Sequence, residues 1–116
     1  MRDESCGWVA RISELLTPYE GDTPRFHSGA WRKPFETTGY FAAPALTMLP
    51  HSHVGSPERV IVDRSLSVSF IAALPDDEKR RFAEALRRLI ASDPDLSGRE
   101  EVAFPYRTEA YRCVRL

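Results

Sequence analysis

The sequence lacks asparagine and glutamine altogether and contains only two cysteines, Cys6 and Cys113. Without asparagine the chain has no N-glycosylation site, and two cysteines so far apart are too few for a disulfide framework. There is no run of ten consecutive apolar residues, which excludes a membrane-spanning helix. The first eight residues also lack the apolar stretch of a secretory signal, so we expect a cytoplasmic protein.

The short motifs of nucleotide, hydrolase, thiol and zinc chemistry are missing as well. The chain contains no G-x-G-x-x-G, G-x-x-x-x-G-K-[ST], G-x-S-x-G, C-x-x-C or H-E-x-x-H. Its six glycines are scattered, so no contiguous loop can surround a phosphate group. The sequence therefore holds no self-contained active site that a motif would identify.

The composition is that of one globular domain spanning residues 1–116. The chain has a mass of 13.2 kDa and is 42% apolar and 28% charged, with a net charge of -1. These values predict one folded unit with a modest core. Balanced charge gives no electrostatic reason to expect nucleic acid or an anionic membrane as a partner.

Apolar periodicity and proline positions predict an α+β arrangement. We expect helices at residues 5–16, 31–38 and 76–91, and strands at residues 45–54 and 101–116. Asp3 or Ser5 can cap the first helix, and Pro18 should end it. Pro50 indicates an edge strand or a bulge, and Pro105 should interrupt the last strand.

Residues 56–74 fit two structures. Residues 65–70 alternate as a half-buried strand does, whereas Ser56-Pro57-Glu58 is a typical helix opening and a helical apolar stripe follows. We favour one or two helices.

His51 and His53 form the sharpest local pattern. Residues two apart on a strand point to the same face, so both imidazoles can reach one metal ion. A third ligand would have to come from His27, Asp63 or Cys113. Such pairs arise easily by chance, so we favour a polar strand face near an opening and predict no metal.

Aromatic residues gather between residues 31 and 41. They are Trp31, Phe35, Tyr40 and Phe41, which can form part of a core or the wall of a ligand pocket. We favour the core.

Taken in order, several segments resemble the C-terminal part of the class I S-adenosylmethionine-dependent methyltransferases, in the type 11 group. The segments are RDESCGWVARISELL (2–16), WRKPFETTGYF (31–41), SVSFIAALP (67–75), RFAEALRRLIASDPDLSG (81–98) and VAFPYRTEAY (102–111). The resemblance implies part of a seven-stranded Rossmann-like sheet. Residues 45–54 would be the sixth strand. Residues 102–111 would contain the antiparallel seventh, which lies between the fifth and the sixth.

The resemblance also implies what this chain does not carry. The Gly-rich loop and the acidic residue that bind S-adenosylmethionine belong to the family's N-terminal half, so we expect no cofactor bound by this chain alone. The remaining half contributes to the substrate side of the family's site. The resemblance therefore suggests four contacts for a small molecule: Trp31, Phe35, His51 and His53. No catalytic residue can be named.

Strands without their neighbours would leave backbone groups unpaired and an apolar face uncovered. We therefore predict that the chain forms a homo-oligomer or complements a separately encoded N-terminal half, and that it is inactive alone. Two alternatives remain: a non-enzymatic dimerising or small-ligand-binding module, and a metal-binding protein that uses His51 and His53.

Overall fold

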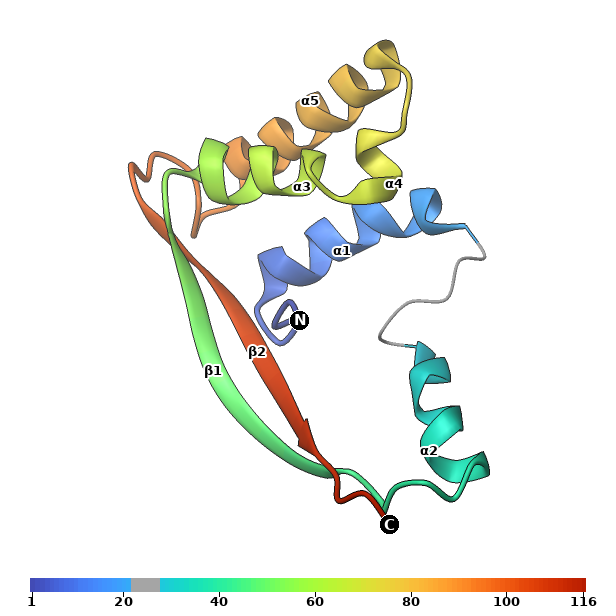
Figure 1. Ribbon diagram of the computed structural model, residues 1–116. Coiled ribbons are helices and arrows are strands. Elements are labelled where there is room, and N and C mark those ends of the chain that lie inside the picture. Colours follow the sequence, from blue (N-terminus) through green and yellow to red (C-terminus); the bar gives the residue numbers. More distant parts are fainter. Residues whose placement is uncertain (22–27) are drawn as a thin grey trace.

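The computed structural model describes residues 1–21 and 28–116, which form a layer of helices at one end of a long two-stranded ribbon (Figure 1). The helical elements are α1 (Gly7–Glu20), the 3₁₀ turn η2 (Ala30–Arg32), α2 (Lys33–Thr37), the π-helical η3 (Glu58–Asp63), α3 (Arg64–Leu66), α4 (Ser69–Ala72) and α5 (Asp76–Ser92). The strands are β1 (Ala45–Gly55) and β2 (Val102–Arg112), which pair antiparallel. The mixture of helix and antiparallel sheet confirms the α+β class.

The helices α1, α3, α4 and α5 lie together, whereas α2 lies near the far end of the ribbon (Figure 1). Within the two described ranges, none of the helices has the length and apolar character needed to cross a bilayer.

Residues 56–74 are helical, so the strand pattern at residues 65–70 is wrong and the helical interpretation is confirmed. The three consecutive residues Val60, Ile61 and Val62 have no exposed surface at all. The π-helical turn that carries them packs against α5 on one side and the ribbon on the other, which accounts for their complete burial.

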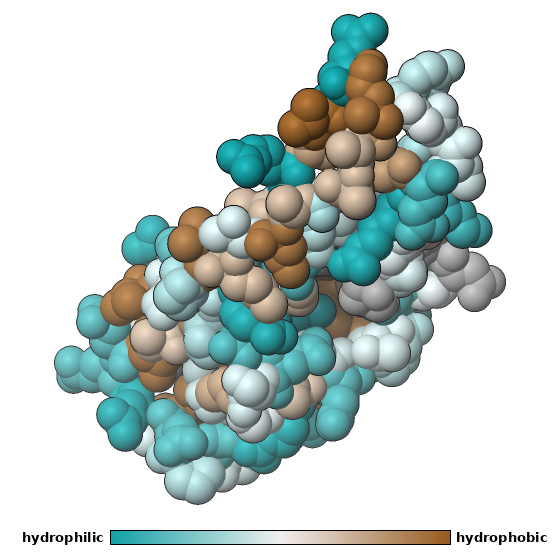
Figure 2. Space-filling view, turned by 90° about the horizontal axis from the view of Figure 1, so that it is seen from below, coloured by the Kyte–Doolittle hydropathy of each residue, from teal (hydrophilic) through white to brown (hydrophobic). Residues whose placement is uncertain are grey.

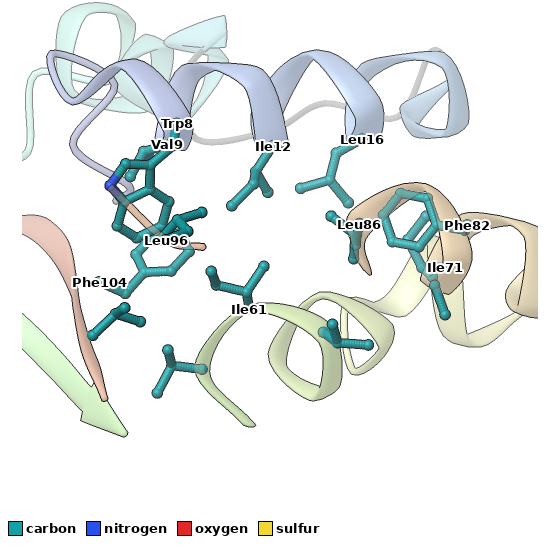
Figure 3. Close-up of a cluster of buried hydrophobic side chains, with 14 residues drawn as sticks. Trp8, Val9, Ile12, Leu16, Ile61, Ile71, Phe82, Leu86, Leu96 and Phe104 are labelled. Carbon is teal, nitrogen blue, oxygen red and sulfur yellow. The ribbon is translucent and has the colours of Figure 1, made fainter. Parts of the chain in front are cut away.

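One hydrophobic core holds the helical layer together. The side chains of α1 point toward Ile61, with Phe104 of the ribbon at one end of the cluster and Phe82 and Ile71 at the other (Figure 3). The stripe on α5 supplies Phe82, Ala83 and Leu86 to this core, and three acidic residues in its first turn complement the helix dipole.

The predicted end of the first helix at Pro18 is wrong, because α1 continues through Pro18 to Glu20. A proline within a helix removes the hydrogen bond to the carbonyl four residues earlier. In the last turn this is a single bond, so the helix tolerates the loss. The N-cap is Cys6, without a side-chain hydrogen bond, so neither Asp3 nor Ser5 caps α1 as expected.

The predicted interruption at Pro105 is also wrong, because β2 is continuous. The Pro105 carbonyl accepts a hydrogen bond from the Asp3 N–H (3.0 Å), and the Arg107 N–H donates to the Met1 carbonyl (2.8 Å). Residues 105 and 107 thus direct their backbone groups away from β1. Pro50 lies opposite Arg107, where an antiparallel ladder needs no donor from either strand. Both prolines therefore fit, and Pro50 lies on an edge strand as predicted.

Only one end of the ribbon reaches the core. Val102 and Phe104 at the start of β2 are buried, whereas almost all of β1 is exposed. Residues 1–3 lie along the other side of β2, where Arg2 forms an antiparallel bridge with Tyr106. At the far end Phe41 bridges to Arg115, which extends the pairing beyond the two strands.

Two ion pairs join the helices. Arg11 of α1 pairs with the Asp93 carboxylate, which is buried and also accepts a hydrogen bond from the Asp95 N–H (2.8 Å). Arg87 of α5 donates to Glu58 of η3 (2.6 Å from Nη2 to Oε1), and this hydrogen bond lowers the pKa of Glu58 below its ordinary value. Both Glu58 and Arg87 are about half exposed, so solvent screens their pair.

The turn from β1 into η3 requires a glycine. A Cβ placed on Gly55 would lie 2.9 Å from Cγ1 of Val60, which is completely buried and cannot move aside. We expect Gly55→Ala to lower the free energy of unfolding by about 1–3 kcal/mol, as overpacking does. Urea denaturation followed by circular dichroism measures it.

Gly7→Ala is the matched control. No atom lies within 4 Å of a Cβ at this position, which is helical. We expect this substitution to be neutral or to stabilise by up to about 1 kcal/mol. Equal effects of the two substitutions would contradict the steric explanation.

Candidate functional site

The predicted site residues fall into two separate groups. His51 and His53 lie on the face of β1 that is turned toward the helices, because their cross-strand partners are Tyr106 and the buried Phe104. Trp31 instead lies against Tyr111, five residues further along β2. At about 3.4 Å per residue the two groups are roughly 17 Å apart along the strand.

The histidine group lines an open cavity of about 330 Å³ between the ribbon and the helices. Its lining residues are Met1, His51, His53, Arg64, Tyr106 and Thr108. The ribbon supplies four of them from one face, and Arg64 comes from the first turn of α3. The His51 and Tyr106 rings lie 6.2 Å apart, and Tyr106 stacks on Phe104 with the ring centroids 4.7 Å apart.

The cavity has hydrogen-bond donors on several sides and no acidic side chain in its lining. Asp3, which lies near the cavity because Arg2 bridges to Tyr106, is engaged elsewhere. Ser5 donates two hydrogen bonds to the Asp3 carboxylate, one from its hydroxyl and one from its backbone N–H. Both bonds lower the pKa of Asp3, and the bond from the hydroxyl has the larger effect. Arg107 lies 3.8 Å from the same carboxylate. Among the side chains that line the cavity, Arg64 therefore carries the permanent charge.

The sequence analysis missed four of the six lining residues, Met1, Arg64, Tyr106 and Thr108. Arg64, Tyr106 and Thr108 lie 13 or more residues from His51 in sequence, and no motif connects them to it. The signal that could have found two of them is strand register. Once β1 and β2 are paired with His51 opposite Tyr106, Thr108 follows on the same face.

The second group is a half-buried aromatic cluster that holds η2 and α2 against the far end of the ribbon. Its ring contacts are Trp31–Tyr111 at 4.7 Å, Trp31–Phe35 at 6.5 Å and Phe35–Phe41 at 5.7 Å. The Arg32 guanidinium lies 5.1 Å from the Trp31 ring and donates to the Tyr111 hydroxyl (2.9 Å), which donates in turn to Glu109 (2.7 Å). Tyr40 is 68% exposed, and within the described residues it makes no ring contact with this group. The cluster is separate from the main core, because none of its members belongs to it.

The metal hypothesis gains no third ligand from the part of the chain that the structure describes. No group of three His, Cys, Asp or Glu side chains there could hold a metal ion. Neither Asp63 nor Cys113 lines the cavity with His51 and His53. His27 lies outside the described residues.

The residues present do not fit S-adenosylmethionine. Four glycines have positive φ, but Gly21, Gly29, Gly39 and Gly98 lie at four separate turns. A nucleotide-binding loop needs several backbone N–H groups directed at one anion, usually where a strand leads into a helix. No step of methyl transfer is therefore assigned to this chain's own residues.

Another hollow, of about 420 Å³, lies on the outer face of α5 between Glu84, Arg87, Arg88 and Ala91. All four residues belong to one helix, so the hollow is a furrow between its side chains. Arg87 there is already paired with Glu58. The cavity beside His51 is the better candidate for a binding site.

Comparison with known proteins gives one indication of function. The chain is 27% identical over 110 residues to a protein of Schizosaccharomyces pombe described as uncharacterized and methyltransferase-like. The alignment covers 95% of this chain but 42% of that protein, so the chain spans less than half of its relative's length. No protein-family profile matches the chain, and no solved structure matches it. The chain is thus similar, over most of its own length, to a protein described as methyltransferase-like.

The two tryptophans test whether the aromatic cluster is independent of the core. Trp8 is 6% exposed and lies edge-to-face against Phe104 at 5.2 Å. We expect Trp8→Ala to lower the free energy of unfolding by about 3–5 kcal/mol. Trp31→Ala should cost about 1 kcal/mol or less in the same urea titration, because its contacts lie outside the helical core. An equal loss from both substitutions would mean that the two clusters form one unit.

Proposed function

We propose that the chain is the C-terminal, substrate-side segment of a class I S-adenosylmethionine-dependent methyltransferase of the type 11 group, acting on a small molecule and inactive alone. The observation that carries the proposal is the strand order. β2 lies between residues 1–3 and β1 and is antiparallel to both. The resemblance places residues 2–4 just after the family's fifth strand and gives its antiparallel seventh strand a position between the fifth and the sixth.

The similarity to the methyltransferase-like relative supports the same assignment, because it extends over 95% of this chain. That relative is itself uncharacterized. The cofactor, the substrate and the Rossmann-like sheet therefore belong to the proposal. Within it, the cavity beside His51 and His53 is the substrate-facing surface, and Trp31 and Phe35 close the far end of the ribbon.

The shape of the molecule supports association with another polypeptide. Its radius of gyration is 17.1 Å, whereas a compact chain of this length has roughly 13 Å. Its accessible surface is 7865 Å², against roughly 6,400 Å² for a compact monomer of the same mass. The difference of about 1,400 Å² is more than the roughly 800 Å² that each partner buries in an interface of standard size.

The exposed surface is also apolar along the ribbon. Leu46, Met48 and Val54 are each about half exposed on one face of β1. Figure 2 shows hydrophobic side chains reaching the surface among polar ones on the underside of the molecule. On the outer edge of β2, residues 109 and 111 direct their backbone groups away from β1 by the alternation seen at residues 105 and 107. We propose that a second copy, or a separately encoded N-terminal half, covers these surfaces.

The same exposed surface favours a second candidate function. A non-enzymatic dimerising or small-ligand-binding module would also present an apolar ribbon and a cavity, without any need for the cofactor half. Cofactor binding by the assembled protein distinguishes the two functions.

Isothermal titration calorimetry with S-adenosylmethionine tests the cofactor part of the proposal. We expect no binding heat from the isolated chain, because its glycines do not form a cradle for the cofactor. Titration of the chain mixed with the complementary N-terminal segment of the S. pombe relative should restore binding. Micromolar binding by the isolated chain would contradict the proposal, and no binding by a stable mixed complex would favour the non-enzymatic module.

Size-exclusion chromatography with light scattering tests association. We expect the chain at micromolar concentration to have a mass of at least twice 13.2 kDa. Leu46→Lys combined with Met48→Lys should shift it toward the monomer, because charges on this face oppose its burial. Ala91→Lys, an exposed apolar-to-lysine change on α5, is the matched control. A well-folded wild-type monomer would contradict self-association.

A further inference from the structure

We propose that the cavity beside His51 binds the anionic group of a small organic acid, with Arg64 as its principal contact. The inference rests on the proposal that this cavity is the substrate-facing surface, and it adds the chemical class of the ligand. The ligand group is a carboxylate or a phosphate ester, which present the same acceptor oxygens and negative charge to the site.

Arg64 is free to bind a ligand. Within residues 1–21 and 28–116, its side chain has no ion pair and no hydrogen bond, and no acidic side chain lines the cavity with it. A guanidinium carries five N–H donors in a planar fork that matches a carboxylate or phosphate bidentately. Arg64 is therefore a cation without a counterion at the mouth of the cavity.

The ribbon adds a row of donors opposite Arg64. His51 and His53 are two residues apart on β1, so their imidazoles lie about 7 Å apart on one face. Tyr106 and Thr108 present hydroxyl groups from the same face of β2. Imidazole and hydroxyl groups both donate to anionic oxygens. With no acidic side chain in the lining, the site favours an acceptor-rich anion over a cation or a neutral sugar.

The cavity also has an apolar wall that a bare inorganic anion would not use. Tyr106 stacks on the buried Phe104, with ring planes inclined by 20°, and its ring is partly accessible from the cavity side. A volume of about 330 Å³ is at the lower end of the range for small-molecule sites. These two features together favour an organic acid with a planar or apolar body next to its anionic group.

Nuclear magnetic resonance titration of the isotope-labelled chain tests the inference with three probes of similar shape: benzoate, phenyl phosphate and neutral benzamide. We expect saturable shifts at His51, His53 and Tyr106 with at least one of the two anions and none with benzamide. The stronger of the two anions identifies the ligand as a carboxylate or as a phosphate ester. Equal binding of benzamide, or no saturable binding by either anion, would overturn the inference.

Arg64→Gln should weaken the binding of the preferred anion at least tenfold, since a hydrogen bond to a charged group contributes about 1.5–3 kcal/mol. Arg59→Gln removes the same charge from an exposed position five residues earlier, outside the cavity lining. It should change affinity less than twofold. Because both arginines are exposed, both variants should fold, which their amide spectra verify. Equal weakening by both variants would reduce the effect to net charge and overturn the role of Arg64.

The outcome is independent of the tests of the proposed function. Loss of anion binding together with restored cofactor binding in the mixed complex would overturn only the ligand class. Anion binding by a chain that never restores cofactor binding would place the cavity in the small-ligand module instead.

Discussion

The edge-to-face contact between Trp8 and Phe104 joins the two parts of this molecule. Trp8 belongs to α1, and Phe104 lies near the start of β2, where the ribbon enters the core. Together with Val102, Phe104 is where β2 becomes buried, and beyond it the ribbon extends into solvent. The contact also bears on the ribbon residues of the candidate site, because Tyr106 stacks directly on Phe104 and lies opposite His51.

The ribbon is buried against the helical core at one end only, at Val102 and Phe104. A two-stranded sheet is marginal by itself and needs a third strand or a helix against it. Here residues 1–3 support the middle of β2 through the bridge between Arg2 and Tyr106, and the Trp31–Tyr111 contact supports the far end. Between these supports the ribbon keeps one face open toward the helices and the other toward solvent. The open inner face provides the cavity, and the outer face exposes Leu46, Met48 and Val54, the surface through which we propose that a partner binds.

Local sequence patterns predicted most of the elements, because their periodicity and their turn residues agree. The apolar stripe on α5 is flanked by acids at its start and by Asp93-Pro94 at its end, and the structure places the helix there. The expectations for Pro105 and Pro18 were wrong, because a local rule for proline does not consider which backbone groups are paired at that position. Pro105 is compatible with a continuous strand because its missing N–H would have pointed at residues 1–3 rather than at β1. Pro18 is compatible with α1 because it costs one hydrogen bond in the last turn.

By itself the sequence determined the α+β class and the shared face of His51 and His53, and it favoured helices over a strand for residues 56–74. These features depend on the spacing of residue types along the chain, which the sequence shows directly. Only the tertiary structure decided which distant side chains meet. It separated Trp31 and Phe35 from the histidines and placed Arg64, Tyr106 and Thr108 beside them. The physical reason is that strand register and the packing of η3, which leads directly into α3, against the ribbon bring together residues that are far apart in sequence. No local pattern encodes that contact.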